Sequence, residues 1–261
     1  MSELLVEDAD GVRTLTFNRP ESYNAFTTPL KEAFLAALQD AAADASVRAL
    51  VITGAGRAFC AGQDLKEHIG LLQAGDPAPL NTVEKHYNPI VRELIAMPKP
   101  VIAAVNGSAA GAGASIAYAA DLRIAGQSAK FLMAFANVGL TADSGASYTL
   151  PRLIGYGRAM EMMLLAQPVG AEEALRVGMV NQVVPDSELL STAHLLAAKL
   201  AKGPTTAYAK IKEALAAAAD GTLEDALEAE RRTQAECGAT EDHREAVDAF
   251  VNKRAANFSG K

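Results

Sequence analysis

Residues 99–121 read KPVIAAVNGSAAGAGASIAYAAD, and this stretch decides what fold the chain can adopt. The apolar run Val101–Val105 lies between a proline and an Asn-Gly pair, which predicts a fully buried strand. Small residues fill 108–115, and a helical pattern follows over Ile116–Ala120. A strand that passes through glycine and alanine into a helix N-terminus leaves backbone N–H groups free to bind a ligand. The alternative interpretation is a tight packing turn between a strand and a helix.

A second stretch of the same kind lies upstream. The apolar run Val47–Thr53 predicts another buried strand, and Gly54-Ala55-Gly56 turns the chain. Residues 58–66, AFCAGQDLK, again place small residues between a strand and a predicted helix. Because the pattern occurs twice, we interpret both stretches as backbone-donor loops that leave room for a ligand.

Composition excludes several classes of protein. The chain has 261 residues, 50% of them apolar, which suffices for one large domain or one domain with an appendage. A net charge of −7 argues against a general nucleic-acid binder. Cys60 and Cys237 form neither a disulfide framework nor a metal spacing, which suits a reducing cytosol. The four histidines contain no ligand pair of the HExxH kind, so we expect no metal site.

The ends and apolar runs of the chain also carry expectations. The start, MSELLVEDADG, has neither a basic nor an apolar region, so we expect no signal peptide. No apolar run approaches the roughly 18 residues that cross a bilayer, so we expect no membrane partner.

Strand and helix patterns alternate along the chain. Leu4–Val6 and Val12–Phe17 flank a turn and predict a hairpin, and a helix is predicted from Thr28, as its N-cap, to about Ala43. The other expected elements are a surface loop or lid edge around Gly75–Pro79, a helix at 83–97 that Pro89 kinks or begins, strands at 122–124 and 129–133, a loop at 136–147, helices at 150–155, 158–166 and 171–178, a strand at 180–184 and four helical segments from Ser187 onward. This order predicts an α/β core over 1–185 and a C-terminal helical region over 186–261.

Six segments carry a resemblance to a known family. They are RAFCAGQDLKE (57–67), KPVIAAVNG (99–107), AAGAGAS (109–115), LPRLIGYGRAMEMML (150–164), GMVNQVV (178–184) and AFVNKRAANF (249–258). Over nearly its whole length the chain resembles the crotonase superfamily, the acyl-coenzyme A enzymes that include enoyl-CoA hydratases and isomerases. The resemblance implies an α/β crotonase (ClpP-like) fold of repeated β-β-α units with a C-terminal helical trimerisation region. It also implies a cytoplasmic homotrimer or dimer of trimers whose substrate is an acyl-CoA, with no separate cofactor.

The resemblance further implies an oxyanion hole, which holds the thioester carbonyl and stabilises an enolate. Its two donors correspond to the backbone N–H groups of Gln63 and Ala112, one in each backbone-donor loop. The positions that resemble coenzyme A- and substrate-binding residues are Ala61, Asp64, Leu65, Lys66, Phe135, Phe250 and Lys253. Phe250 and Lys253 resemble C-terminal residues of the family that contact coenzyme A, either within one chain or across a subunit boundary. Plain helix packing is an equal alternative for Phe250.

The acid and base groups decide which reaction such a site performs. Hydratases of the family carry two glutamates, and the corresponding residues are Ser115 and Phe135, so we do not expect hydration by that route. Asp143 resembles the single catalytic aspartate of the 1,2-epoxyphenylacetyl-CoA isomerases and of related Δ3,Δ2-enoyl-CoA isomerases; a helix N-cap is the alternative. The 4-chlorobenzoyl-CoA dehalogenases also have an aspartate there, but their tryptophan and histidine are replaced by Phe135 and Asn88.

We therefore expect Asp143, with a pKa raised by burial, to move a proton between two carbons of an acyl-CoA. Such an isomerase would serve phenylacetate catabolism with an epoxide substrate, or fatty acid metabolism with a 3-enoyl substrate. Tyr87 and Asn88 either line the acyl pocket or pack in the core. The alternative of another class is a non-catalytic acyl-CoA or RNA-binding member, and the net charge of −7 argues against RNA.

Overall fold

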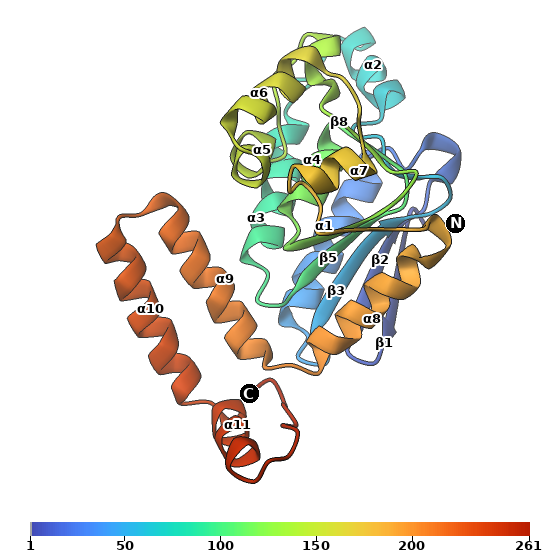
Figure 1. Cartoon of the computed structure of the whole chain (residues 1–261). Helices are drawn as coiled ribbons and strands as arrows, with labels where there is room; N and C mark the ends of the chain where they lie inside the picture. Colours follow the sequence, from blue (N-terminus) through green and yellow to red (C-terminus); the bar gives the residue numbers. More distant parts are fainter. Residues whose placement is uncertain (1) are drawn as a thin grey trace.

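The computed structural model describes residues 2–261, whose core contains two β-sheets (Figure 1). The six-stranded sheet has the order β1-β2-β3-β5-β7-β10, and the four-stranded sheet has the order β4-β6-β8-β9. The strands are β1 Leu4–Ala9, β2 Val12–Phe17, β3 Ala49–Gly54, β4 Ala58–Cys60, β5 Val101–Val105, β6 Ser108–Ala110, β7 Leu122–Gly126, β8 Lys130–Leu132, β9 Val169–Gly170 and β10 Gln182–Val184. Pairing is parallel except in the β1–β2 hairpin and between β8 and β9.

A β-β-α unit repeats along the chain and confirms the predicted fold class. In each unit the first strand (β3, β5, β7) joins the larger sheet and the second (β4, β6, β8) joins the smaller one. Glycine makes these corners possible, because a Cβ on Gly54 would lie 2.3 Å from the Ala58 carbonyl oxygen. A Cβ on Gly107 would lie 2.1 Å from the carbonyl oxygen of Arg57.

Both faces of the larger sheet are covered at its centre, so strands β3 and β5 are buried apolar runs rather than alternating ones. In β3, Leu50 and Ile52 face the main core, whereas Ala49 and Val51 face a second apolar cluster. That cluster is completed by α8, Leu189–Ala201, which lies across the sheet in Figure 1. The main core is covered by helices α1, Thr28–Ala43, α3, Asn88–Ala96, and α4, Ala112–Ala119.

The C-terminal region extends away from this core. Helices α9, Thr205–Asp220, and α10, Leu223–Gly238, form a hairpin, and α11, Glu241–Val251, lies at its open end, near the start of α9, in Figure 1. The four predicted helical segments are confirmed, but the expectation of helix to the chain end is wrong. Residues 252–261 fold back without helix, and Asp242 accepts hydrogen bonds from the N–H groups of Ser259 (2.7 Å) and Gly260 (2.9 Å).

Several predicted boundaries differ from the structure for local reasons. The N-cap of α1 is Thr27 rather than Thr28, and its hydroxyl oxygen accepts the Leu30 N–H at 3.2 Å. Pro89 lies in the first turn of α3 and follows a π-helical turn, η2, Val83–Tyr87. Helix α4 begins at Ala112, four residues before the predicted start at Ile116.

The remaining elements are α2, Leu65–Gln73, α5, Ala146–Ile154, α6, Tyr156–Leu165, α7, Ala171–Arg176, and the short turns η1, Pro20–Ser22, η3, Ala134–Val138, and η4, Asp186–Glu188. The start of α5 and most of η3 fall within the predicted loop at 136–147. Within residues 2–261, no helix combines the length and apolar character needed to cross a bilayer.

Candidate active site

A cavity of about 420 Å³ lies where the two backbone-donor loops meet. It is lined by Glu21, Ser22, Ala25, Ala61, Gly62, Gln63, Asp64, Leu65, Lys66, His68, Leu80, Thr82, Val83, Tyr87, Gly111, Ala112, Ala134, Phe135, Val138, Leu140 and Asp143. Its size falls in the range of small-molecule sites, and apolar side chains form much of its wall. The loops that we expected to leave room for a ligand therefore border one cavity.

The two loops approach each other so closely that only glycine fits between them. A Cβ on Gly113 would lie 2.2 Å from the carbonyl oxygen of Cys60. Gly62, with φ +89°, would place a Cβ 2.8 Å from the Ala110 carbonyl oxygen and 3.3 Å from the Ala112 nitrogen. These small residues therefore fix the separation of the loops, and the Ala112 amide lies beside the 61–64 backbone.

The backbone around Gln63 is held in strand geometry. The Phe26 N–H donates to the Gly62 carbonyl at 2.7 Å, and the Asp64 N–H donates to the Phe26 carbonyl at 3.0 Å. Because alternate residues of a strand bond to the same neighbour, the N–H of Gln63 points to the side away from Phe26. Ala112 is the first residue of α4, where a backbone N–H has no partner inside the helix.

Asp143 reaches the cavity from the loop between η3 and α5. Its Oδ1 accepts a hydrogen bond from the Ser144 hydroxyl at 2.8 Å. Burial raises the pKa of the Asp143 carboxyl, and the Ser144 hydrogen bond and the positive charge of Lys31 oppose that rise. The alternative role as helix N-cap is wrong, because Gly145 caps α5 and no side chain accepts a capping hydrogen bond from the N–H groups of its first turn.

The other carboxylates of the wall are engaged differently. Asp64 accepts the backbone N–H groups of Lys66 (3.0 Å) and Glu67 (3.2 Å), and so caps α2. Arg19 also donates to Asp64 at 2.9 Å. Burial acts to raise the pKa of Asp64, but these hydrogen bonds lower it overall. Glu21 lies exposed in η1, so Asp143 is the partly buried lining carboxylate that is not committed to holding the fold.

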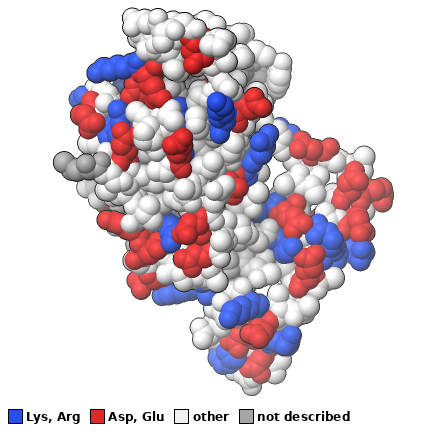
Figure 2. Space-filling model, turned by 180° about the vertical axis from the view of Figure 1, so that it is seen from behind, with Lys and Arg blue, Asp and Glu red and all other residues white. Residues whose placement is uncertain are grey.

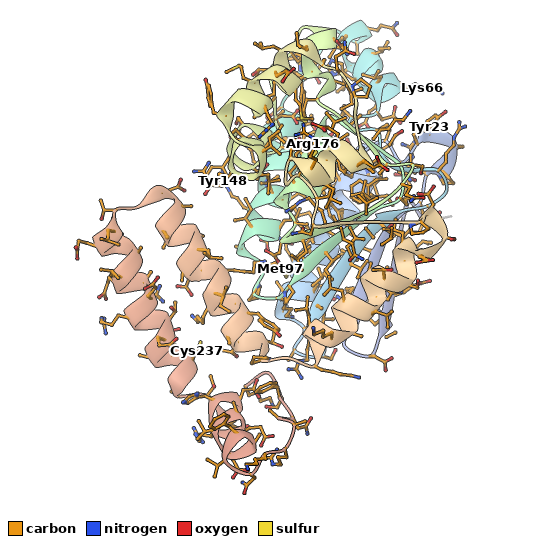
Figure 3. All side chains as sticks on the ribbon, viewed as in Figure 1. Tyr23, Lys66, Met97, Tyr148, Arg176 and Cys237 are labelled. Atoms are coloured by element: carbon orange, nitrogen blue, oxygen red, sulfur yellow. The ribbon has the colours of Figure 1, made fainter. Side chains whose placement is uncertain are left out.

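Most of the predicted site residues come together at the cavity. Those that line it are Ala61, Gln63, Asp64, Leu65, Lys66, Ala112, Phe135 and Asp143. Phe250 and Lys253 do not line the cavity of their own chain, since they lie at the end of α11. Figure 3 shows Lys66 on α2, on the side of the core away from the C-terminal helices that carry Cys237. The chain therefore does not bring its own C-terminal pair to the site.

The two positions that resemble the glutamate positions of hydratases carry residues with other contacts. Ser115 is fully buried, and its hydroxyl donates to the Gly111 carbonyl at 2.9 Å. The ring of Phe135 lies beside Gly111, and a Cβ on that glycine would be 3.8 Å from the ring. Neither residue can transfer a proton as a carboxylate does.

The sequence analysis did not identify Lys31 as a buried polar residue, and it left open whether Tyr87 lines the cavity or packs in the core. Lys31, on α1, is only 1% exposed, and its ammonium donates to Gln63 Oε1 at 3.1 Å and to Thr82 Oγ1 at 2.6 Å. The Tyr87 hydroxyl donates to the same Gln63 oxygen at 2.5 Å, so Tyr87 lines the cavity as well as packing. A lysine within an amphipathic helix gives no signal of burial, because its partners lie on other elements.

Among the residues that the structure describes, the cavity has neither a cluster of metal ligands nor a reactive thiol. Within residues 2–261, no group of three or more His, Cys, Asp or Glu side chains is arranged to hold a metal ion. Cys60 is fully buried, and burial raises the pKa of its thiol to about 12. On the face that Figure 2 draws, positive and negative side chains are intermingled. Such mixing does not resemble the basic stripe of a nucleic-acid-binding surface.

Comparisons with known proteins find similar sequences and similar structures over nearly the whole chain. The family model described as enoyl-CoA hydratase/isomerase matches residues 7–261. A 1,2-epoxyphenylacetyl-CoA isomerase of Escherichia coli is 45% identical, with 100% of both chains covered. A Rhodobacter capsulatus protein named as an enoyl-CoA hydratase is 43% identical over 98% of this chain and 97% of its own. A crystal structure from Mycobacterium abscessus, described as an enoyl-CoA hydratase/isomerase, has a TM-score of 0.95, 42% identity and coverage of 99% and 100%.

Proposed function

The chain belongs to the enoyl-CoA hydratase/isomerase family, and we propose that within this family it is an isomerase of acyl-CoA thioesters. The observation that carries this proposal is the state of Asp143. It is a partly buried lining carboxylate that is not committed to holding the fold, and desolvation raises its pKa. A carboxyl with a raised pKa is suited to take up a proton and give it back.

In the proposed reaction, the thioester carbonyl oxygen accepts hydrogen bonds from the Gln63 and Ala112 backbone N–H groups. These donors stabilise the negative charge that forms on that oxygen, which makes the adjacent C–H bond more acidic. Asp143 removes the C2 proton, and the electron pair of the C–H bond enters the enolate. The side chains of Gln63 and Ala112 take no part in this step.

Two substrates suit a single proton shuttle. With a 3-enoyl-CoA, Asp143 returns the proton to C4, and the double bond moves from C3–C4 to C2–C3. With 1,2-epoxyphenylacetyl-CoA, the substrate named for the Escherichia coli relative, the bond between the two epoxide carbons breaks while both carbon–oxygen bonds are kept, which gives the seven-membered oxepin ring. Asp143 removes the proton from C2 and returns it to a carbon of that ring. Neither route requires an activated water, so one carboxylate is enough.

Hydration is the competing reaction, because a relative named as a hydratase is nearly as similar to this chain. The residues present argue against it, since Phe135 in the cavity wall and the fully buried Ser115 occupy the positions that resemble the glutamate positions of the family's hydratases. Incubating the protein with a panel of acyl-CoA thioesters separates the two reactions by mass spectrometry. Isomerised products retain the mass of the substrate, whereas hydrated products gain one water, and water addition as the main outcome would refute the isomerase proposal.

We also propose that the chain assembles into a trimer or a dimer of trimers, through its C-terminal region. Large apolar side chains remain uncovered there, with Phe250 86%, Leu223 71% and Leu215 67% exposed. In such an assembly Phe250 and Lys253 would contact the coenzyme A bound to a neighbouring subunit. Light scattering of the purified protein tests the assembly, and a monomer at micromolar concentration would contradict it.

A further inference from the structure

A buried polar cluster lies behind one wall of the cavity, and the proton shuttle does not use it. The cluster consists of Lys31, Gln63, Thr82 and Tyr87, joined by the three hydrogen bonds described above. Lys31 and Tyr87 are each 1% exposed. Burying an ammonium group and a hydroxyl costs free energy unless both form hydrogen bonds. Here the hydrogen bonds to Gln63 and Thr82 offset that cost and hold the Gln63 side chain in place.

The chemistry of the partners fixes the orientation of the Gln63 carboxamide. Burial lowers the pKa of Lys31, and the negative charges of Glu67, Glu32, Asp143 and Asp64 oppose that fall. An ammonium group can only donate hydrogen bonds. Burial raises the pKa of Tyr87, so its hydroxyl keeps the proton that it donates. The atom of Gln63 that faces both donors must therefore be its oxygen, and the NH₂ group must face the other way.

The other side of Gln63 is the cavity. Across residues 2–261 as described, Gln63 Nε2 donates to no protein group, and no fully buried side-chain nitrogen or oxygen lacks a partner. The NH₂ group is therefore open to the cavity that Gln63 lines. The same cavity is also lined by apolar side chains, among them Leu80, Val83, Phe135, Val138 and Leu140. A hydrocarbon acyl group that displaces water from this wall would leave the amide donor unpaired, which is unfavourable.

We propose that the Gln63 side-chain amide is a specificity-determining group, which selects acyl groups carrying an acceptor oxygen close to the thioester. Epoxide, ether, hydroxyl and carbonyl oxygens belong to this class. The oxygen must be within a few carbons of the thioester, because the backbone N–H of the same residue holds the thioester oxygen. This inference rests on the proposed function, since it takes the Gln63 and Ala112 amides as the thioester site.

The test is a binding measurement with two ligands that differ in one oxygen atom. Isothermal titration calorimetry gives the Kd of butanoyl-CoA and of 3-hydroxybutanoyl-CoA for the wild-type protein and for Gln63→Met. Methionine keeps the length of the side chain and the backbone N–H but removes the amide. We expect the wild type to prefer the hydroxylated ligand by about tenfold, the effect of one neutral hydrogen bond, and the variant to bind the two equally.

Because Gln63→Met leaves the buried Lys31 ammonium with fewer acceptors, a second pair of variants guards against misfolding. Lys31→Met is compared with Lys31→Met/Gln63→Met, and the double variant should lose the preference that the single one retains. If both ligands bind and their ratio is unchanged by loss of the amide, Gln63 only holds its loop and the inference is wrong. If the wild type binds neither ligand, the thioester site is wrong, and the proposed function fails together with the inference.

Discussion

Replacement of Asp143 by asparagine is the most direct perturbation of the proposed reaction. Asparagine is nearly the same size as aspartate, and its side-chain oxygen can still accept the Ser144 hydroxyl, which bonds to Asp143 at 2.8 Å in the wild type. The variant therefore removes the ability to take a proton and leaves the Gln63 and Ala112 amides in place. Acyl-CoA binding should change by no more than a few-fold.

The loss of rate can be bounded from the contents of the cavity. A positioned general base contributes about 10²–10⁴ to the rate, which corresponds to about 2.7–5.5 kcal/mol of activation free energy. Asp64 cannot substitute, because Arg19 and two backbone N–H groups hold it, and Glu21 is exposed at the wall. We therefore expect kcat to fall by roughly 10³ or more, near the upper part of that range.

The assay follows the isomerisation of a 3-enoyl-CoA and of 1,2-epoxyphenylacetyl-CoA by the wild type and by Asp143→Asn. Calorimetric titration with a saturated acyl-CoA confirms that the variant still binds, and Asp76→Asn serves as a matched control. Asp76 is an exposed carboxylate outside the cavity wall, on the loop after α2. If Asp143→Asn binds its ligand and turns over at the wild-type rate, Asp143 is not the base and the mechanism is wrong.

Three further predictions follow from the same contacts. Gly113→Ala should destabilise the protein by about 1–3 kcal/mol or prevent folding, measured by urea denaturation, because its Cβ would lie 2.2 Å from the Cys60 carbonyl oxygen. On the acid side, kcat/KM should fall at a pH above the ordinary pKa of an aspartate, because the pKa of Asp143 is raised. Lys31→Met should move this fall to higher pH, since Lys31 lowers the pKa of Asp143. Burial raises the folded-state pKa of Asp143 above 3.8. The protonated carboxyl therefore contributes to the stability of the folded protein below pH 3.8, and this contribution is lost as the pH rises through the raised pKa. Asp143→Asn should therefore be more stable than the wild type at pH 7 in thermal denaturation, and that advantage should vanish below about pH 3.8; an advantage that persists there would contradict this assignment.

The strongest sequence signals concerned elements whose pattern is local. The buried run Val101–Val105 forms β5 with the predicted bounds, and its continuous apolar character follows from burial on both faces. The short strands β6 and β9 were not predicted, because two or three small residues show no periodicity. Helix α4 was predicted to begin too late for a related reason, since Gly113 lowers helix propensity and the small residues at the start of the helix show no apolar periodicity.

At the candidate site, sequence reasoning found the groups whose role depends on a motif. Gln63, Ala112 and Asp143 were proposed from the sequence, and all three line one cavity. Lys31 was not found, because its contacts with Gln63 and Thr82 join segments that are distant along the chain.

The sequence by itself determined the family, the repeated alternation of strand and helix, the helical C-terminal region and the presence of two small-residue loops. These features depend on residue order and on periodicities of a few residues, which a chain carries before it folds. Only the tertiary structure decided how closely the two loops approach, which carboxylate is left uncommitted in the cavity, and which way the Gln63 amide faces. Each of these depends on burial and on partners from other elements, because desolvation and hydrogen bonding act between groups that folding brings together.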